Sequence, residues 1–259
     1  MVELPRECRY EVSEGFRARN RSCGRVIMSG AIALDLASAR TNNPRIVPIQ
    51  SLRHGMTYGE WAGAWWAWAV GIPAATNPIL DATGEFGDID QEGSAWFLAG
   101  TFGGPAERTL TIPPGKSLFF PLLNSLWWAP DDLESAAFAV EVELGLNPDD
   151  FTDEELIALA AIWAVTFDEL EMTCTVDGDE LSNLEQYFAE SPGFQITDTD
   201  LVDDLGTPIS QPNTAVAAGY WIMLRPLPIG EHTIRFTVDA DDLSLGPFNV
   251  DVTYYITVE

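Results

Sequence analysis

Two histidines, His54 and His232, are the side chains best suited to acid–base or metal chemistry near neutral pH. His54 precedes a tryptophan-rich segment, and His232 begins an expected strand. If the fold brings them together, a carboxylate such as Glu60, Glu231 or Asp251 would complete an acid–base pair or a metal site. The chain has neither the HExxH nor the HxH spacing of metal-binding histidines, which favours two independent surface or capping histidines.

The segment NSLWWAPDD (124–132) is the second place where the residue types suggest a site. Trp127 and Trp128 end an expected strand, and Asp131 and Asp132 follow it. Adjacent residues of a strand face opposite sides, so at least one indole is expected to be exposed. An indole beside carboxylates suits sugar binding or acid–base chemistry; the alternative is one ring in the core and two acids that begin the next helix. The candidate catalytic residues are therefore His54, Glu60, Asp131 and His232, and the candidate ligand-binding residues are Trp127, Trp128, Asp131 and Asp132.

The acidic turn DIDQEG (88–93) matches the opening of a calcium-binding loop. Asp88, Asp90 and Glu92 occupy ligand positions, but position 99, where the closing bidentate glutamate belongs, is Ala99. The sequence therefore predicts at most weak calcium or magnesium binding by these three carboxylates, and the alternative is a solvated turn. No other cofactor is indicated.

Other catalytic patterns are absent or incomplete. PPGKS (113–117) lacks the first glycine of a phosphate-binding loop, because position 110 is Leu110, and we interpret Pro114-Gly115 as a hairpin turn. The chain has no G-x-S-x-G motif, the commonest sign of a serine hydrolase. Cys174 lies in an alternating strand and is expected to be a small buried hydrophobe.

The charge balance is strongly acidic, with a formal net charge of -27 over 259 residues. Residues 28–259 hold 36 of the 40 acidic groups and 7 of the 13 basic ones. Such a surface repels phosphate backbones, so nucleic acid is a poor partner, and it suits a salty or extracellular setting where screening relieves self-repulsion. Neutral or cationic small molecules are the ligands that this charge favours.

Residues 1–27 differ from the rest, because they contain six arginines and no helical or strand periodicity. They are expected to be a leader or a disordered segment, with Met28 as an alternative start to Met1, and residues 28–259 are expected to form one domain. No apolar core of a secretory signal is present. Three scattered cysteines indicate neither a disulfide framework nor a zinc site.

A tryptophan-rich helix is predicted from Thr57 to about Val70. Thr57 and Glu60 form a capping box, and Gly71 ends the helix. At 100° per residue three indoles share one face, which indicates packing in the core rather than ligand stacking or membrane contact. The helix is too short to span a bilayer. The three indoles are those of Trp61, Trp65 and Trp68.

Strand-like runs flank a helical insertion at about 130–170. The alternation is clearest in residues 248–259, and the second helix of the insertion carries a Thr152–Glu155 capping box. This order predicts an α+β, mainly β fold: an antiparallel β-sandwich or jelly-roll-like body with helical decoration. Three further strands, expected at 94–102, 107–113 and 116–124, are predicted to form a meander. Two more are expected at 219–227 and 231–239, each followed by a hairpin connection to the next strand.

Several blocks of the sequence resemble a group of bacterial proteins, many of them exported, that have no established activity. The blocks are YGEWAGAWWAWAVGIP, WFLAGTFGG, PPGKSLFFPLLN, AAGYWIMLRPLPIGEHTIRF and DVTYYITV. The resemblance implies a secreted, sandwich-like domain and transfers no catalytic residues. The missing signal sequence departs from it, so a cytoplasmic location stays open beside an extracellular or cell-surface one.

Three functions are consistent with these features. The first is a binding domain that recognises a glycan or another neutral to cationic ligand through tryptophans and carboxylates. The second is a hydrolase, glycosidase-like, that uses paired carboxylates or a His/carboxylate pair. The third is a structural subunit of an oligomer, which predicts that the tryptophan stripe is exposed in the monomer.

Overall fold

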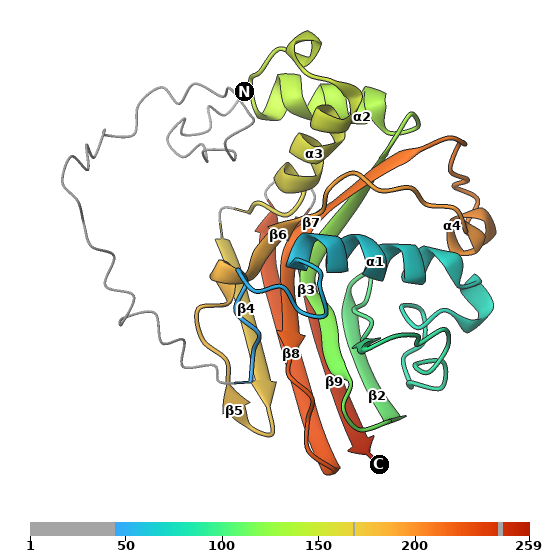
Figure 1. The fold of residues 1–259 in the computed structure, drawn as a ribbon. Coiled ribbons are helices and arrows are strands. Elements are labelled where there is room, and N and C mark those ends of the chain that lie inside the picture. Colours follow the sequence, from blue (N-terminus) through green and yellow to red (C-terminus); the bar gives the residue numbers. More distant parts are fainter. Residues whose placement is uncertain (1–44, 168, 243–245) are drawn as a thin grey trace, which may run out of the picture.

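The computed structural model describes residues 45–167, 169–242 and 246–259 (Figure 1). The expected leader, Met28 and the first two cysteines lie outside these ranges. The described chain is α+β and mainly β, with two mixed sheets. The four-stranded sheet has the order β1 (Ala95–Phe97), β3 (Ser117–Ala129), β7 (Thr214–Leu224) and β6 (Phe188–Glu190). The five-stranded sheet has the order β2 (Gly104–Ile112), β9 (Gly246–Val258), β8 (Gly230–Asp242), β4 (Glu169–Val176) and β5 (Asp179–Glu180).

The expected antiparallel arrangement is wrong for two strand pairs. β1 pairs parallel with β3, and β2 pairs parallel with β9. The predicted meander is also wrong, because β2 leaves the sheet of β1 and β3. The turn at Pro114-Gly115 therefore connects two sheets and closes no hairpin, and the same holds for residues 225–229 between β7 and β8. A turn sequence reports a change of chain direction but not which strand becomes the neighbour.

The C-terminal strand confirms the alternation that the sequence predicts. Val250, Val252, Tyr254, Ile256 and Val258 are all buried, while the residues between them are partly or fully exposed. β8 and β9 form the expected antiparallel pair, although residues 243–245 of their connection lie outside the described ranges.

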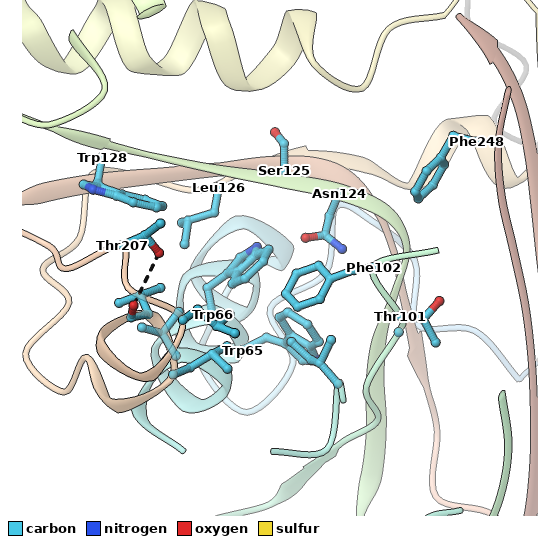
Figure 2. Close-up of a pocket in the computed structure, with 16 residues that line it drawn as sticks. Trp65, Trp66, Thr101, Phe102, Asn124, Ser125, Leu126, Trp128, Thr207 and Phe248 are labelled. Atoms are coloured by element: carbon cyan, nitrogen blue, oxygen red, sulfur yellow. Dashed lines mark hydrogen bonds between the residues drawn. The ribbon is translucent and has the colours of Figure 1, made fainter. Parts of the chain in front are cut away.

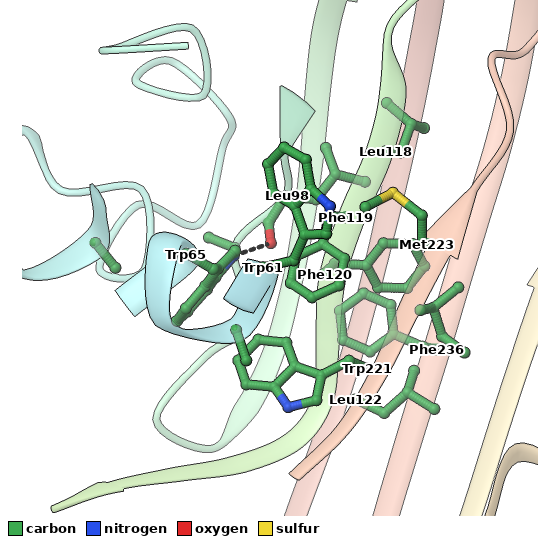
Figure 3. Packing of buried hydrophobic residues seen from close by; sticks show 14 of the residues in the cluster. Trp61, Trp65, Leu98, Leu118, Phe119, Phe120, Leu122, Trp221, Met223 and Phe236 are labelled. Atoms are coloured by element: carbon green, nitrogen blue, oxygen red, sulfur yellow. Dashed lines mark hydrogen bonds between the residues drawn. The ribbon is translucent and has the colours of Figure 1, made fainter. Parts of the chain in front are cut away.

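Helix α1 (Tyr58–Gly71) begins with the predicted capping box. The Thr57 side chain accepts a hydrogen bond from the Glu60 backbone, and the Glu60 carboxylate accepts one from the Thr57 backbone. All four indoles of the helix are buried, as the core interpretation predicts. Figure 3 shows two of them, Trp61 and Trp65, among the core residues. No helix within the described ranges is long and apolar enough to cross a membrane. The stripe is covered by the chain itself, so it offers no docking face to a partner.

α1 packs against one face of the four-stranded sheet through aromatic contacts. The Trp65 and Trp221 rings lie 5.7 Å apart, and Phe119 stacks on Trp221 at 5.3 Å with an interplanar angle of 4°. On the other face of this sheet, Phe120 stacks on Phe236 of the five-stranded sheet at 5.3 Å (Figure 3). The order of layers is therefore α1, the four-stranded sheet and the five-stranded sheet.

The insertion forms a small hydrophobic cluster of its own at one end of β3 and β7 (Figure 1). Its second helix has the predicted capping box, in which Thr152 and Glu155 bond reciprocally. The remaining helical elements are η1 (Ala74–Thr76), α2 (Leu133–Phe138), η2 (Ala139–Glu143), η3 (Pro148–Asp150), α3 (Asp153–Trp163), η4 (Leu184–Tyr187) and α4 (Asp200–Asp204).

Arg108 of β2 is a fully buried cation that is held by neutral oxygens. Its Nε donates to the Asp81 carbonyl, Nη1 to the Ala99 carbonyl and the Tyr254 hydroxyl, and Nη2 to the Ile79 and Gly100 carbonyls. These five bonds use all five guanidinium N–H groups. In the part of the chain that is described, no carboxylate forms an ion pair with it. The guanidinium therefore joins two loops to the five-stranded sheet.

We predict that Arg108→Lys lowers the free energy of unfolding by about 2–4 kcal/mol, because an ammonium has three donors and at least two of the five Arg108 hydrogen bonds are lost. Urea denaturation followed by tryptophan fluorescence measures the change. Arg235→Lys is the matched control, since Arg235 is exposed and bonds Asp251 at 2.8 Å; it should leave the urea midpoint almost unchanged. An unchanged midpoint for Arg108→Lys would show that this network does not hold the loops.

Candidate functional site

A cavity of about 430 Å³ lies between α1, β3, α4 and residues 100–102, which we call the α1–β3 cavity (Figure 2). Its walls are mainly apolar, and no ionisable side chain occurs among the described residues that line it. The lining residues are Trp65, Trp66, Val70, Ile79, Gly100, Thr101, Phe102, Asn124, Ser125, Leu126, Trp128, Leu201, Val202, Leu205, Thr207 and Phe248. A largely apolar pocket with a few polar groups is the usual form of a small-molecule site.

Three of the lining residues carry a buried polar atom without a hydrogen-bond partner. These atoms are Nε1 of Trp66, Nε1 of Trp128 and Oδ1 of Asn124. An unpaired buried donor or acceptor costs about 1–3 kcal/mol, so native proteins rarely keep several in one place. Their presence in one cavity makes it the candidate functional site.

Trp66 differs from the other indoles of α1. The Nε1 groups of Trp61, Trp65 and Trp68 each donate to a backbone carbonyl at 3.0 Å, from Arg53, Leu98 and Ile89 respectively. Trp66 has no such acceptor although it is only 9% exposed. Three of the four indole N–H groups of α1 therefore have an acceptor. The unpaired one belongs to Trp66, which lines the cavity together with Trp65.

An irregularity in β3 places the cavity residues on this side. The register with β7 shifts between Pro121, which pairs with Trp221, and Leu123, which pairs with Tyr220. One extra residue reverses the alternation, so residues 124, 126 and 128 share the α1 face with Phe119. Figure 2 shows Asn124 and Leu126 on the opposite side of β3 from Ser125, whose hydroxyl donates to the Ala161 carbonyl of α3.

The partners of these residues on β7 are small. Asn124, Leu126 and Trp128 lie opposite Gly219, Ala217 and Ala215 respectively, which leaves space on the α1 face. A Cβ atom at Gly219 would lie 2.4 Å from the Leu123 carbonyl oxygen and 2.7 Å from the Asn124 Cα. Gly219 is therefore needed for β7 to approach the irregular part of β3.

Two large apolar side chains that line the cavity are also exposed to solvent. Phe102 is 58% exposed and Leu205, next to α4, is 51% exposed. Large apolar side chains that are both exposed and cavity-lining mark the place where the cavity meets solvent. Figure 2 also shows the Thr207 hydroxyl donating to the Val202 carbonyl, which ties the segment after α4 back to that helix.

The structure separates the four ligand-binding residues that the sequence predicts. Trp128 lines the cavity, whereas Trp127 packs against the helical insertion, so the two rings face opposite sides as expected. The expected exposure of one ring is wrong, because both residues are partly buried. Asp131 accepts two hydrogen bonds from Ser210, which lower the pKa of this carboxyl. Asp132 accepts a bond from the Trp128 backbone, and burial raises the pKa of this carboxyl. Neither aspartate lines the cavity.

The candidate catalytic residues also lie apart. His54 Nε2 contacts the buried Ser117 hydroxyl at 3.1 Å, and burial and then Arg53 lower the pKa of His54. His232 bonds Asp177 at 2.9 Å and the Pro228 carbonyl at 2.8 Å. Glu60 is engaged in the cap of α1. The structure therefore does not bring the histidines together, because each bonds its own neighbours.

The predicted calcium ligands Asp88, Asp90 and Glu92 are exposed in the turn before β1. They do not form a cation-binding group: within residues 45–167, 169–242 and 246–259 no three His, Cys, Asp or Glu side chains gather as a metal site requires. Cys174 is fully buried, and burial raises the pKa of its thiol well above the usual range, as expected for a packing residue.

A smaller pocket of about 240 Å³ holds two carboxylates that the sequence did not single out. Glu154 at the start of α3 and Glu190 at the end of β6 both line it, together with Ser191. Burial, and then the charge of Glu154, raise the pKa of the Glu190 carboxyl. The two glutamates are 36 positions apart in sequence, and no local pattern connects them.

Comparisons with protein-family models, with curated proteins and with solved structures gave no match. The geometry of the two pockets is therefore the basis for inferring a function.

We predict that Glu190→Gln raises stability at pH 7 and above. A carboxyl whose pKa is higher in the folded than in the unfolded protein contributes stability at low pH and loses it as pH rises through the folded pKa. The free energy of unfolding of the wild type should therefore fall relative to Glu190→Gln between pH 4 and pH 8, as urea denaturation at each pH measures. Glu185→Gln, at an exposed position, should give a curve parallel to the wild type. Parallel curves for Glu190→Gln as well would contradict the prediction.

Proposed function

We propose that this protein is a binding domain for a small, neutral and largely apolar molecule, which occupies the α1–β3 cavity. One observation carries the proposal: an apolar cavity lined by three residues whose buried polar atoms have no partner. A cavity without any polar group needs no ligand, and a structural polar cluster satisfies its own members. The combination is typical of a site that a ligand completes.

The size of the cavity suits such a ligand. Small-molecule pockets range from about 300 to about 1,000 Å³, and the α1–β3 cavity measures about 430 Å³. An apolar cavity of about 150 Å³ is enough for benzene. A molecule of two to three rings, or an equivalent aliphatic body, is therefore the expected occupant.

The chemistry of the walls favours a neutral ligand over a charged one. A cation buried here would lie without a counter-charge, because the lining holds no carboxylate. A glycan keeps the aromatic contacts that Trp66 and Trp128 offer, but its many hydroxyl groups exceed the polar atoms available in this cavity. We therefore narrow the expected ligand to a neutral molecule with few polar groups.

The proposal includes a β-sandwich architecture and an exported location. The stacking of Phe120 on Phe236 between the sheets supports the first. The resemblance to exported bacterial proteins and the acidic composition support the second.

Leu126→Trp is expected to fill the cavity and abolish ligand binding, because Leu126 points into it (Figure 2). The neutral fluorescent probe N-phenyl-1-naphthylamine, whose emission rises in apolar surroundings, measures this. The wild type should bind the probe with saturation at a 1:1 ratio, and the variant should lose at least about 90% of the signal.

Val142→Trp is the matched control, since it adds an indole at a position that is 56% exposed and outside the cavity. It should bind the probe as the wild type does. Equal binding by Leu126→Trp, or tighter binding of a neutral oligosaccharide followed by tryptophan fluorescence, would overturn the proposed ligand site or ligand class.

A hydrolase that uses paired carboxylates is the second candidate function. The pocket of Glu154 and Glu190 favours it, because glycoside hydrolysis needs two carboxyl groups that face one cleft, and the one that acts as general acid has a raised pKa. The raised pKa of Glu190 makes it the proton donor of the pair. Its partner Glu154 would act as base or nucleophile.

This candidate predicts that the wild type releases nitrophenol from a panel of 4-nitrophenyl glycosides. Glu190→Gln should lower kcat/KM by at least about 100-fold, the usual contribution of a general acid. Glu185→Gln should keep the wild-type rate. No release from any glycoside of the panel would exclude the panel's sugars as substrates and leave the binding function as the better supported one.

A further inference from the structure

We propose that the ligand of the α1–β3 cavity is an alcohol whose hydroxyl group bonds Nε1 of Trp66 and Oδ1 of Asn124 at the same time. This inference depends on the proposed function, since it names the ligand class of the same cavity. Both atoms are buried and unpaired, and both belong to residues that line the cavity. Figure 2 shows the Trp66 indole and the Asn124 amide directed toward each other across the space between α1 and β3.

The two protein atoms have opposite hydrogen-bonding roles. An indole Nε1–H can only donate, and an amide oxygen can only accept. They do not bond each other in the structure. A group placed between them must therefore accept from Trp66 and donate to Asn124, and a hydroxyl group is the smallest neutral group that does both with one atom.

Other functional groups of a ligand bond only one of these two protein atoms. An ether, ester or ketone oxygen accepts from Trp66 but leaves the Asn124 oxygen unpaired. An ammonium donates to Asn124 but leaves the indole unpaired and buries a charge in a cavity whose described lining has no carboxylate. A hydroxyl group also reproduces the two bonds that a water molecule would make at this place, so its entry loses no hydrogen bond.

Trp66 and Asn124 are both held in regular secondary structure, so the site can distinguish a ligand with a hydroxyl group from one without it. Trp66 lies in the middle of α1, which is capped by Thr57 and Glu60. Asn124 lies in β3 at the position opposite Gly219, directly after the irregularity in register. A fixed site that bonds a ligand hydroxyl rejects the analogue that lacks it, because the analogue leaves buried polar atoms unpaired.

Three naphthalenes of nearly equal shape test the proposal by isothermal titration calorimetry at pH 7. They are 2-naphthol, 2-methoxynaphthalene, which keeps the acceptor but loses the donor, and naphthalene, which lacks both. The wild type should bind 2-naphthol about tenfold more tightly than either analogue, the usual effect of one to two hydrogen bonds. Partition into an apolar phase alone gives the opposite order, since the hydroxyl compound is the most water-soluble.

Two variants locate the preference. Asn124→Leu removes the acceptor and Trp66→Phe removes the donor, and each should reduce the preference for 2-naphthol to about twofold or less while naphthalene still binds. Trp96→Phe is the matched control, because Trp96 also has a buried unpaired Nε1 but does not line the cavity. It should keep the tenfold preference. Circular dichroism confirms that each variant is folded, and either variant alone suffices for the test.

The outcomes separate this inference from the proposed function. Equal affinity for the three compounds, or tighter binding of 2-naphthamide than of 2-naphthol, overturns the alcohol and leaves a ligand-binding cavity. Failure of all three compounds and of N-phenyl-1-naphthylamine to bind overturns both proposals. A tenfold preference for 2-naphthol that survives in either folded variant, Asn124→Leu or Trp66→Phe, also overturns the inference.

Discussion

The extra residue in β3, between Pro121 and Leu123, is the constraint on which the arrangement of the molecule depends. Side chains alternate along a strand, so a single insertion exchanges the two faces for every residue that follows. Before it, Phe120 faces the five-stranded sheet; after it, the even-numbered residue Asn124 lies on the face of α1. The same strand therefore contributes Phe120 to the core between the sheets and Asn124 to the lining of the cavity.

The buried guanidinium of Arg108 supports the same cavity from the other side. Two of the carbonyl groups that it bonds belong to Ile79 and Gly100, which line the cavity. Each bond is made inside the protein, where an unsatisfied carbonyl is costly. The loops before β1 and β2 are therefore held in place by polar bonds at positions where no strand pairing is available. Packing alone fixes them less firmly, because loops have few apolar contacts.

The two pockets differ in the property that decides what each can bind. The α1–β3 cavity excludes charge, and its polar groups are neutral donors and acceptors. The pocket of Glu154 and Glu190 concentrates negative charge, and burial makes one of its carboxyls easier to protonate. A neutral, mainly apolar ligand is compatible with the first and gains nothing from the second. The acidic surface that dominates the composition takes no part in the first cavity.

The sequence by itself determined the local structure: the caps of α1 and α3, the burial of the tryptophan stripe and the two faces of β9. These follow from interactions within about four residues or from a period of two, which a sequence displays directly. It also contained a sign of the irregularity in β3, since Pro121 lies inside a central strand, where proline is confined to such places. Only the tertiary structure decided the parallel strand pairs, the unpaired state of Trp66 and the meeting of Glu154 with Glu190. Each of these depends on which distant segments become neighbours, and hydrogen-bond satisfaction is a property of those neighbours rather than of the residue.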